Sequence, residues 1–290
     1  MGNNGKTMSA RLVNSLAEDY RTNRELQTDR ELTLKLVERR PELYEFTSEE
    51  NKADKEIASA CFKTDGRLIR FAPESIRSDP KVALVAATDY PLCVSFLTGE
   101  AAKSKEIATV VAESGGSAIE MLPKEFFADK DIARIAVSKN AKNIRFFTEE
   151  VRADESVCLA ALAQDRTICA CFSNDAFASD RVFEKSVRAD RGLISPNTLS
   201  NDMPLGLFEK IAEKKMSIRL TAQKLDLLTI DYDKLYAVLK VCDGNVIRKK
   251  ELLARIVDKD DRKCAELLCK RFSVPPQIVK DILPYAVQHR

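Results

Sequence analysis

Residues 54–78 read DKEIASACFKTDGRLIRFAPESIRS, and variants of this block recur along the chain every 25 residues. Each block opens on a short polar residue, and an aliphatic residue follows three positions later. The opening residues are Asp29, Asp54, Asp79, Ser104, Asp129 and Asp154. The aliphatic residues are Leu32, Ile57, Val82, Ile107, Ile132 and Val157. Six copies with the same spacing would not arise by chance, so the pattern is typical of a repeat protein. Repeat proteins usually bind other macromolecules.

A single block predicts its own local structure. Asp54 can cap a helix, because its carboxylate accepts the free backbone N–H groups at a helix start. The apolar stripe within residues 57–61 has helical spacing, and Gly66 ends the helix. A second, shorter apolar run at 68–72 then meets Pro73, which starts a turn or another helix. The block is therefore two short helices and a one-turn link, and neighbouring blocks must stack to cover their apolar faces.

These features predict an all-α protein, with a right-handed-type α-solenoid of about seven to eight helical hairpins of 25 residues and a C-terminal helical segment. The 25-residue spacing becomes irregular after Asp154, and the next helix cap is either Ser179 or Asp180. Residues 193–196 are expected to form a shortened second helix. The predicted organisation is a flexible N-terminus at 1–8, a capping half-repeat at 9–28, the repeat array at 29–221 and the C-terminal helical segment at 222–290.

The block also carries a family resemblance. The signature Asp-x-Glu-aliphatic-Ala-x-x-Ala, followed by x-Leu-Ile-x-Phe-Ala-Pro-Glu, is clearest at 54–74 and is visible again at 129–150. It resembles an uncharacterised helical repeat family, the domain of unknown function 4116, over about residues 28–205. The resemblance implies an all-helical repeat array and brings no known activity or catalytic residue. Ser104 departs from the family's Asp. Residues 235–290 resemble ankyrin-type helix pairs, without their Thr-Pro-Leu-His start.

Charge is nearly balanced over the chain but uneven along it. The formal net charge is +2, which gives no global sign of a nucleic-acid or membrane binder. Residues 204–290 hold 18 Lys+Arg and 12 Asp+Glu, a net of +6, which leaves −4 for the remainder. This basic segment, with its cluster at 248–250, hints at an acidic partner, although a solvated surface explains it equally well. No leader and no long apolar run is present, so we expect a cytoplasmic protein without membrane contact.

The residue types needed for catalysis are scarce. His289 is the single histidine, so Ser-His-Asp and Cys-His chemistry lack a base. Free cysteines behave as small buried hydrophobes, and five of them occupy slots that other blocks fill with apolar residues: Cys61, Cys93, Cys158, Cys169 and Cys171. We therefore expect packing roles for them, with a four-cysteine metal site as the alternative. The sequence predicts no catalytic residue, no metal and no cofactor, and thus no enzyme.

The best binding candidates are the positions that vary. Thirteen and sixteen residues after each opening residue, the side chains differ from block to block, whereas their flanking positions are apolar and repetitive. We expect them to form a row on one face of the second helices: Glu42, Glu45, Arg67, Arg70, Glu120, Lys142 and Arg145. An ordinary solvated face is the alternative. One position later, Phe46, Phe71, Phe96 and Phe146 share the register of the aliphatic stripe, so we expect them in the core rather than stacking on bases.

Together these patterns predict a non-enzymatic protein–protein interaction solenoid that acts by binding, as a scaffold, an adaptor or an inhibitor. Its partner would be another protein. The alternative is a nucleic-acid-binding helical repeat protein that uses the basic C-terminal segment, and its affinity would fall steeply with salt.

Overall fold

The computed structural model describes residues 10–187, 189–190, 193–194, 202–214, 216–218 and 233. The elements that they form are helices, apart from three two-residue strands. The chain divides into two compact units, residues 1–146 and residues 147–290. The predicted flexible N-terminus at 1–8 lies outside the described residues. So do the predicted C-terminal helical segment and its ankyrin-like pairs, apart from Asp233.

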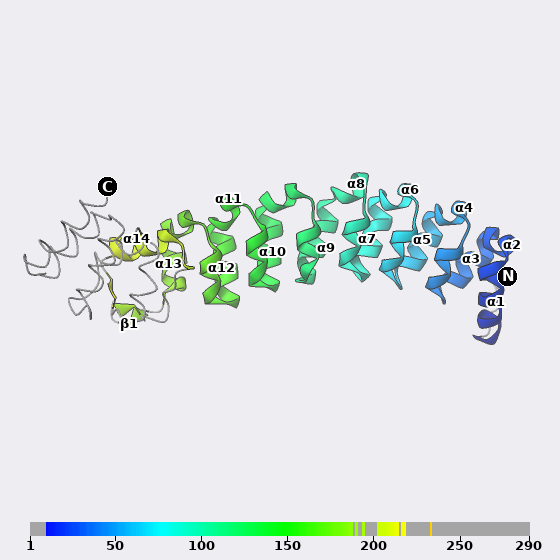
Figure 1. The fold of residues 1–290 in the computed structure, drawn as a ribbon, viewed down its shortest axis with the longest axis horizontal. Helices are drawn as coiled ribbons and strands as arrows, with labels where there is room; N and C mark the ends of the chain where they lie inside the picture. Colours follow the sequence, from blue (N-terminus) through cyan, green and yellow to red (C-terminus); the bar gives the residue numbers. More distant parts are fainter. Residues whose placement is uncertain are drawn as a thin grey trace, which may run out of the picture. The chain divides into compact units, whose positions relative to one another are not determined.

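The first unit is built around α-helices that begin at intervals of 25 residues (Figure 1). They are α3 (Arg30–Val37), α5 (Lys55–Phe62), α7 (Pro80–Asp89), α9 (Lys105–Ser114) and α10 (Lys130–Lys139). Each of them packs against the next one along the chain. Two further helices, α1 (Ala10–Thr22) and α2 (Arg24–Thr28), precede α3 and occupy the stretch predicted as a capping half-repeat.

The second element of each block is the expected short helix, and it is of the 3-10 type. These segments are η1 (Pro41–Phe46), η2 (Gly66–Phe71), η3 (Pro91–Phe96), η4 (Ser117–Met121) and η6 (Ala141–Phe146). The i→i+3 pattern is common in short helical pieces of this kind. The predicted one-turn link follows in each block, as α4 (Glu49–Lys52), α6 (Glu74–Arg77), α8 (Gly99–Ala102) and the 3-10 segment η5 (Lys124–Ala128).

The opening residues cap their helices as predicted. The Asp54 carboxylate accepts the backbone N–H groups of Glu56 at 2.8 Å and Ile57 at 3.2 Å. Asp29, Asp79, Asp129 and Asp154 cap in the same way, and Ser104 does so with its hydroxyl. Where the sequence left two choices, Ser179 and not Asp180 is the cap, since its hydroxyl accepts from Val182 N at 3.3 Å. Each cap satisfies backbone donors that the helix start leaves without an intrahelical partner.

The core of the first unit follows the apolar register of the blocks. Ile57 in α5, Ile69 in η2 and Ile76 in α6 are fully buried. Neighbouring blocks are also joined by backbone hydrogen bonds: Thr98 N donates to Arg77 O at 3.2 Å, and Ser48 N donates to Gln27 O at 3.2 Å. The two bonds occupy equivalent positions two blocks apart, so the contact between blocks involves main chain as well as side chains.

A buried polar network joins α1 to the first block. The hydroxyl of Tyr20 is hydrogen-bonded to Thr33 Oγ1 at 2.7 Å and also to Thr47 Oγ1. Asn51 Nδ2 donates to Gln27 O at 2.9 Å and approaches Thr33 Oγ1 at 3.3 Å. Every one of these polar side chains therefore has a partner, as buried polar groups require.

The described part of the second unit begins with the same kinds of elements. They are α11 (Glu149–Arg152), α12 (Glu155–Gln164), η7 (Arg166–Cys171), η8 (Asn174–Ala178), α13 (Asp180–Ser186) and α14 (Leu205–Glu213). A small sheet accompanies them: β1 (Ala189–Asp190) runs antiparallel to β2 (Leu193–Ile194), and β2 runs parallel to β3 (Ser217–Ile218). The short helix expected at 193–196 is therefore wrong at Leu193 and Ile194, whose backbone pairs with strands on both sides.

Candidate functional site

The 3-10 segments of the first unit present one edge made of exposed and half-buried residues. They stack in chain order, η1 on η2, η2 on η3, η3 on η4 and η4 on η6. Because a 3-10 helix has three residues per turn, residues three apart lie one above the other. We call this edge the 3-10 ridge, defined as the residues thirteen, sixteen and seventeen positions after each opening residue: Glu42, Glu45, Phe46, Arg67, Arg70, Phe71, Leu92, Ser95, Phe96, Ser117, Glu120, Met121, Lys142, Arg145 and Phe146.

All seven sequence-predicted site residues belong to this ridge, which is defined by their positions in the blocks. Six of them are exposed, and Glu42 is half-buried. They come from four of the five segments, and η3 contributes the uncharged Leu92 and Ser95 at the same positions. The predicted row is therefore a surface on which the charge changes from one segment to the next.

The expectation that the periodic aromatic residues belong to the core is wrong. Phe46 is 37% exposed and Met121, in the same position of its block, is 43% exposed. Phe71, Phe96 and Phe146 are half-buried. Other positions of each segment fill the core, for example Leu68 and Ile69 in η2. The periodic aromatic residue, which is the last residue of its 3-10 segment, therefore lies at the side of the segment, and one face of its side chain is exposed to solvent.

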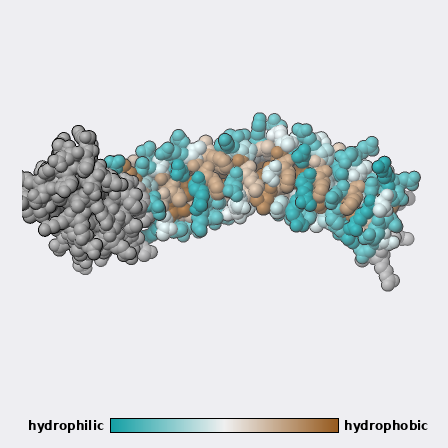
Figure 2. Space-filling view, in the orientation of Figure 1, coloured by the Kyte–Doolittle hydropathy of each residue, from teal (hydrophilic) through white to brown (hydrophobic). Residues whose placement is uncertain are grey.

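The ridge thus combines a partly exposed apolar column with charged side chains. The Arg70 guanidinium lies over the ring of Phe71, 4.6 Å from its centroid, and that of Arg21 lies 5.8 Å from the centroid of Phe46. Such stacking holds a cation against an aromatic face while leaving its charge at the surface. Figure 2 shows one face of the described chain, on which hydrophobic surface is interrupted by hydrophilic side chains.

The charges of the ridge differ in how far they are already neutralised. Arg67 pairs with Asp65 at 2.8 Å, and its hydrogen bond holds the pKa of that carboxyl below the ordinary value. Glu42 pairs with Arg40 at 2.5 Å. Within the part of the chain that the structure describes, no ion pair involves Glu45, Arg70, Glu120, Lys142 or Arg145. These five charges are consequently available to a partner.

The cysteines of the described residues occupy packing positions, as expected. Cys61, Cys93, Cys158 and Cys169 are buried, and Cys171 is half-buried. Burial raises the pKa of Cys93 and of Cys158 to about 12 and that of Cys169 to about 11. A thiol with such a pKa stays protonated near neutral pH, whereas nucleophilic attack and metal binding need the thiolate. Among the described residues, no group of three or more His, Cys, Asp or Glu side chains is placed to hold a metal ion.

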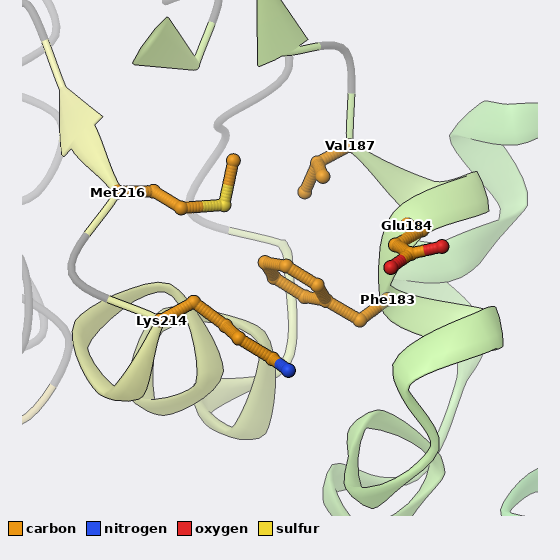
Figure 3. A pocket seen from close by; sticks show the side chains of 5 residues that line it. All are labelled: Phe183, Glu184, Val187, Lys214 and Met216. Atoms are coloured by element: carbon orange, nitrogen blue, oxygen red, sulfur yellow. The ribbon is translucent and has the colours of Figure 1, made fainter. Parts of the chain in front are cut away.

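The second unit contains a pocket of about 370 Å³ that sequence reasoning did not find (Figure 3). It is lined by Phe183, Glu184, Val187, Lys214 and Met216. Phe183 and Met216 point toward one another across it. Phe183 and Glu184 belong to α13 and Val187 follows it, whereas Lys214 and Met216 follow α14, so no local motif could have indicated the pocket. The lining offers apolar surface, one acid and one base, and Lys214 already pairs with Asp180 at 2.7 Å.

Comparison with known proteins bears on the helical blocks. The family model of a domain of unknown function (DUF4116) matches residues 104–152. The match confirms, for this stretch, the resemblance expected from the block signature. No curated protein and no solved structure matches the chain. No helix among the described residues is both long enough and apolar enough to cross a membrane.

Proposed function

We propose that the 25-residue blocks form an α-solenoid of right-handed type and that the protein is a non-enzymatic, cytoplasmic protein-binding module, acting as a scaffold, an adaptor or an inhibitor. The observation that carries this proposal is the 3-10 ridge. Stacked segments place five unpaired charges beside a column of partly exposed aromatic residues. Packing of successive helices in chain order supports the solenoid, since each block covers its neighbour's apolar face.

The chemistry of the ridge suits a protein partner. Aromatic residues, Met and Arg are enriched at the centres of protein interfaces, and truncating such anchors costs most binding energy. The ridge supplies all three, with Phe71 and Phe96 half-buried beside the exposed Arg70. Their backbone is held by buried neighbours such as Ile69 and Val94. A partner can therefore cover these side chains without reordering the segments, which limits the entropic cost of binding.

The alternative function, nucleic-acid binding, receives less support from the ridge. Glu45 and Glu120 alternate with Arg70 and Arg145 along it. A phosphate backbone favours an uninterrupted basic surface, because each neutralised phosphate requires a cation. The basic residues expected to serve this function, at 248–250, lie outside the described residues.

The proposal is tested by affinity capture from the source lysate with the full-length chain as bait, with and without nuclease. The variant R67E/R70E/K142E/R145E reverses four ridge charges. Its matched control, K63E/K81E/K103E/K139E, makes the same change in net charge at exposed lysines away from the ridge. We expect a nuclease-resistant protein partner whose capture falls at least about tenfold with the ridge variant only, because opposed like charges cost several kcal/mol.

Two results would contradict the proposal. Unchanged capture by the ridge variant would exclude the ridge as the interaction surface. Capture that disappears with nuclease would favour nucleic acid. Circular dichroism of both variants checks that neither is unfolded, so that a loss of capture reports on the surface.

A further inference from the structure

One column of the 3-10 ridge has a charge order that is complementary to itself when reversed. The position sixteen residues after each opening residue is exposed in all five segments of the first unit. It holds, in chain order, Glu45, Arg70, Ser95, Glu120 and Arg145. The signs run negative, positive, neutral, negative, positive. Reversing the column places Glu45 opposite Arg145, Arg70 opposite Glu120, and Ser95 opposite itself.

We infer that the ridge pairs with the ridge of a second copy of this chain, antiparallel, around a two-fold axis at Ser95. In a two-fold dimer the same patch is used twice, so each contact between residues i and j occurs a second time as j with i. The column meets this condition at all five positions. The inference rests on the proposal that the ridge is an interaction surface, and it names one occupant of it.

The alternative registers are disfavoured by the same charges. A parallel pairing places every charge opposite its own kind. An antiparallel pairing shifted by one block brings Glu45 against Glu120 in one direction and Arg70 against Arg145 in the other. Like charges facing each other across an interface suppress the wrong arrangement. The register centred on Ser95 therefore forms four contacts between opposite charges, whereas every other register of the column forms at most two.

Further contacts strengthen this register. Lys142 lies one 3-10 turn from Arg145, so a second positive charge faces Glu45 of the other copy. Phe46 and Met121, at 37% and 43% exposed, supply apolar surface beside the charges. Packed helices lie about 8–10 Å apart, so the five segments span about 40 Å. A strip of that length and one or two side chains wide is a small interface, so the dimer should depend on concentration and weaken with salt.

A charge swap on the full-length chain tests the pairing. In the proposed dimer, position 45 of each copy faces position 145 of the other. The variant E45K therefore places two positive residues opposite each other at both of these contacts, and R145E places two negative residues there. Mixing the two variants restores opposite charges at both places. By sedimentation equilibrium we expect each variant alone to self-associate at least about tenfold more weakly than wild type, and the equimolar mixture to return to the wild-type level. The controls K81E and E113K change exposed residues of α7 and α9 outside the ridge.

A cysteine scan locates the axis. Ser95→Cys places two thiols next to each other at the two-fold axis, so mild oxidation should yield a cross-linked dimer. Thr88→Cys, exposed on α7, serves as the control and should not. A wild-type chain that stays monomeric at about 100 μM in low salt, where a dimer with a Kd of about 1 μM would be mostly formed, would overturn the inference, as would a charge-swap mixture that fails to recover. Neither result affects partner capture by the ridge, which tests the proposed function separately.

Discussion

At the scale of the residue, Asp79 has two structural roles. One carboxylate oxygen accepts Lys81 N at 2.9 Å and Val82 N at 3.1 Å, which caps α7. The other pairs with Lys55 Nζ of the preceding block at 2.6 Å. The hydrogen bond from Lys55, together with the backbone bonds, lowers the pKa of Asp79 below its ordinary value of 3.8. The cap could be predicted from the sequence, whereas the contact with Lys55 depends on how two blocks stack.

This lowered pKa has a consequence for the pH dependence of stability. A carboxyl whose pKa is lower in the folded state stabilises the fold above its unfolded pKa, and that stabilisation is lost as pH falls through the folded pKa. We expect Asp79→Asn to reduce the free energy of unfolding near neutral pH and to make its decline below about pH 4 shallower. Urea titrations between neutral pH and about pH 2 measure this. Parallel curves for variant and wild type would contradict it, and Glu113→Gln, exposed on α9, is the control.

Gly66 shows what a single sequence cannot indicate. The sequence marks it as a helix terminator, but the structure places it against the next block, where an added Cβ would lie 2.3 Å from Ala86 O. Its N–H also donates to Asp89 Oδ2 at 2.8 Å. We expect Gly66→Ala to lower the free energy of unfolding by about 1–3 kcal/mol, because the two backbones must separate. A Cβ added at Gly116 would have its nearest neighbouring atom, Ser114 Oγ, 3.9 Å away. Gly116→Ala should therefore change the free energy of unfolding by less than about 0.5 kcal/mol. Equal effects in denaturant titrations would exclude close packing as the cause.

At the scale of the element, the first helices of neighbouring blocks are joined by a row of ion pairs. The residue after one opening residue contacts the opening residue of the next block: Arg30 with Asp54 at 2.7 Å, Lys55 with Asp79 at 2.6 Å, and Lys105 with Asp129 at 2.7 Å. Between α7 and α9 both partners are replaced, by Pro80 and Ser104. In the sequence the row appears as basic and acidic residues 24 positions apart. This spacing predicts ion pairs only when neighbouring blocks are known to pack against each other.

Restoring the missing pair should stabilise that joint. We expect Pro80→Lys and Ser104→Asp to show a favourable coupling energy of about 0.2–1 kcal/mol, the usual range for an exposed ion pair. A double-mutant cycle on the free energy of unfolding isolates this coupling from the separate effects of losing Pro80 and changing the cap. Simple additivity would mean that the two positions do not meet across the α7–α9 contact. The coupling should shrink with added salt.

The second elements show where a sequence pattern is ambiguous. In η2 the apolar residues Leu68, Ile69, Phe71 and Ala72 crowd a segment of six residues and the position after it. In so short a window, spacings of three and four cannot be told apart, so the pattern predicts a helix but not its type. It also contains more apolar residues than the inner side of one segment can bury. The half-exposed Phe71 is the result, and the apolar column of the ridge could therefore not be predicted.

At the scale of the whole molecule, the 25-residue period predicts which elements follow one another but not where the chain divides. The caps from Asp29 to Asp154 and the buried anchors Ile76, Phe126 and Val151 are where the period places them. The strands at 189–190 and 193–194 and the separation into two compact units have no periodic signal, because they depend on contacts that occur only once. The period therefore predicts local order and nearest-neighbour packing, and stability should follow the same rule.

A cavity in one block should consequently destabilise that block and its neighbours more than distant ones. Ile57→Ala in α5 removes a fully buried side chain, a change that costs about 2–5 kcal/mol in well-packed cores. Since blocks in a stacked array contact only their neighbours, we expect amide protons of α3, α5 and α7 to lose protection in hydrogen exchange while α10 keeps it. Ile132→Ala should give the mirror-image result, with loss in α9 and α10 and retention in α3. Lys63→Ala, exposed at the end of α5, controls for substitution alone. Uniform loss across the first unit in both variants would instead show one cooperative domain, in which stability is shared rather than summed block by block.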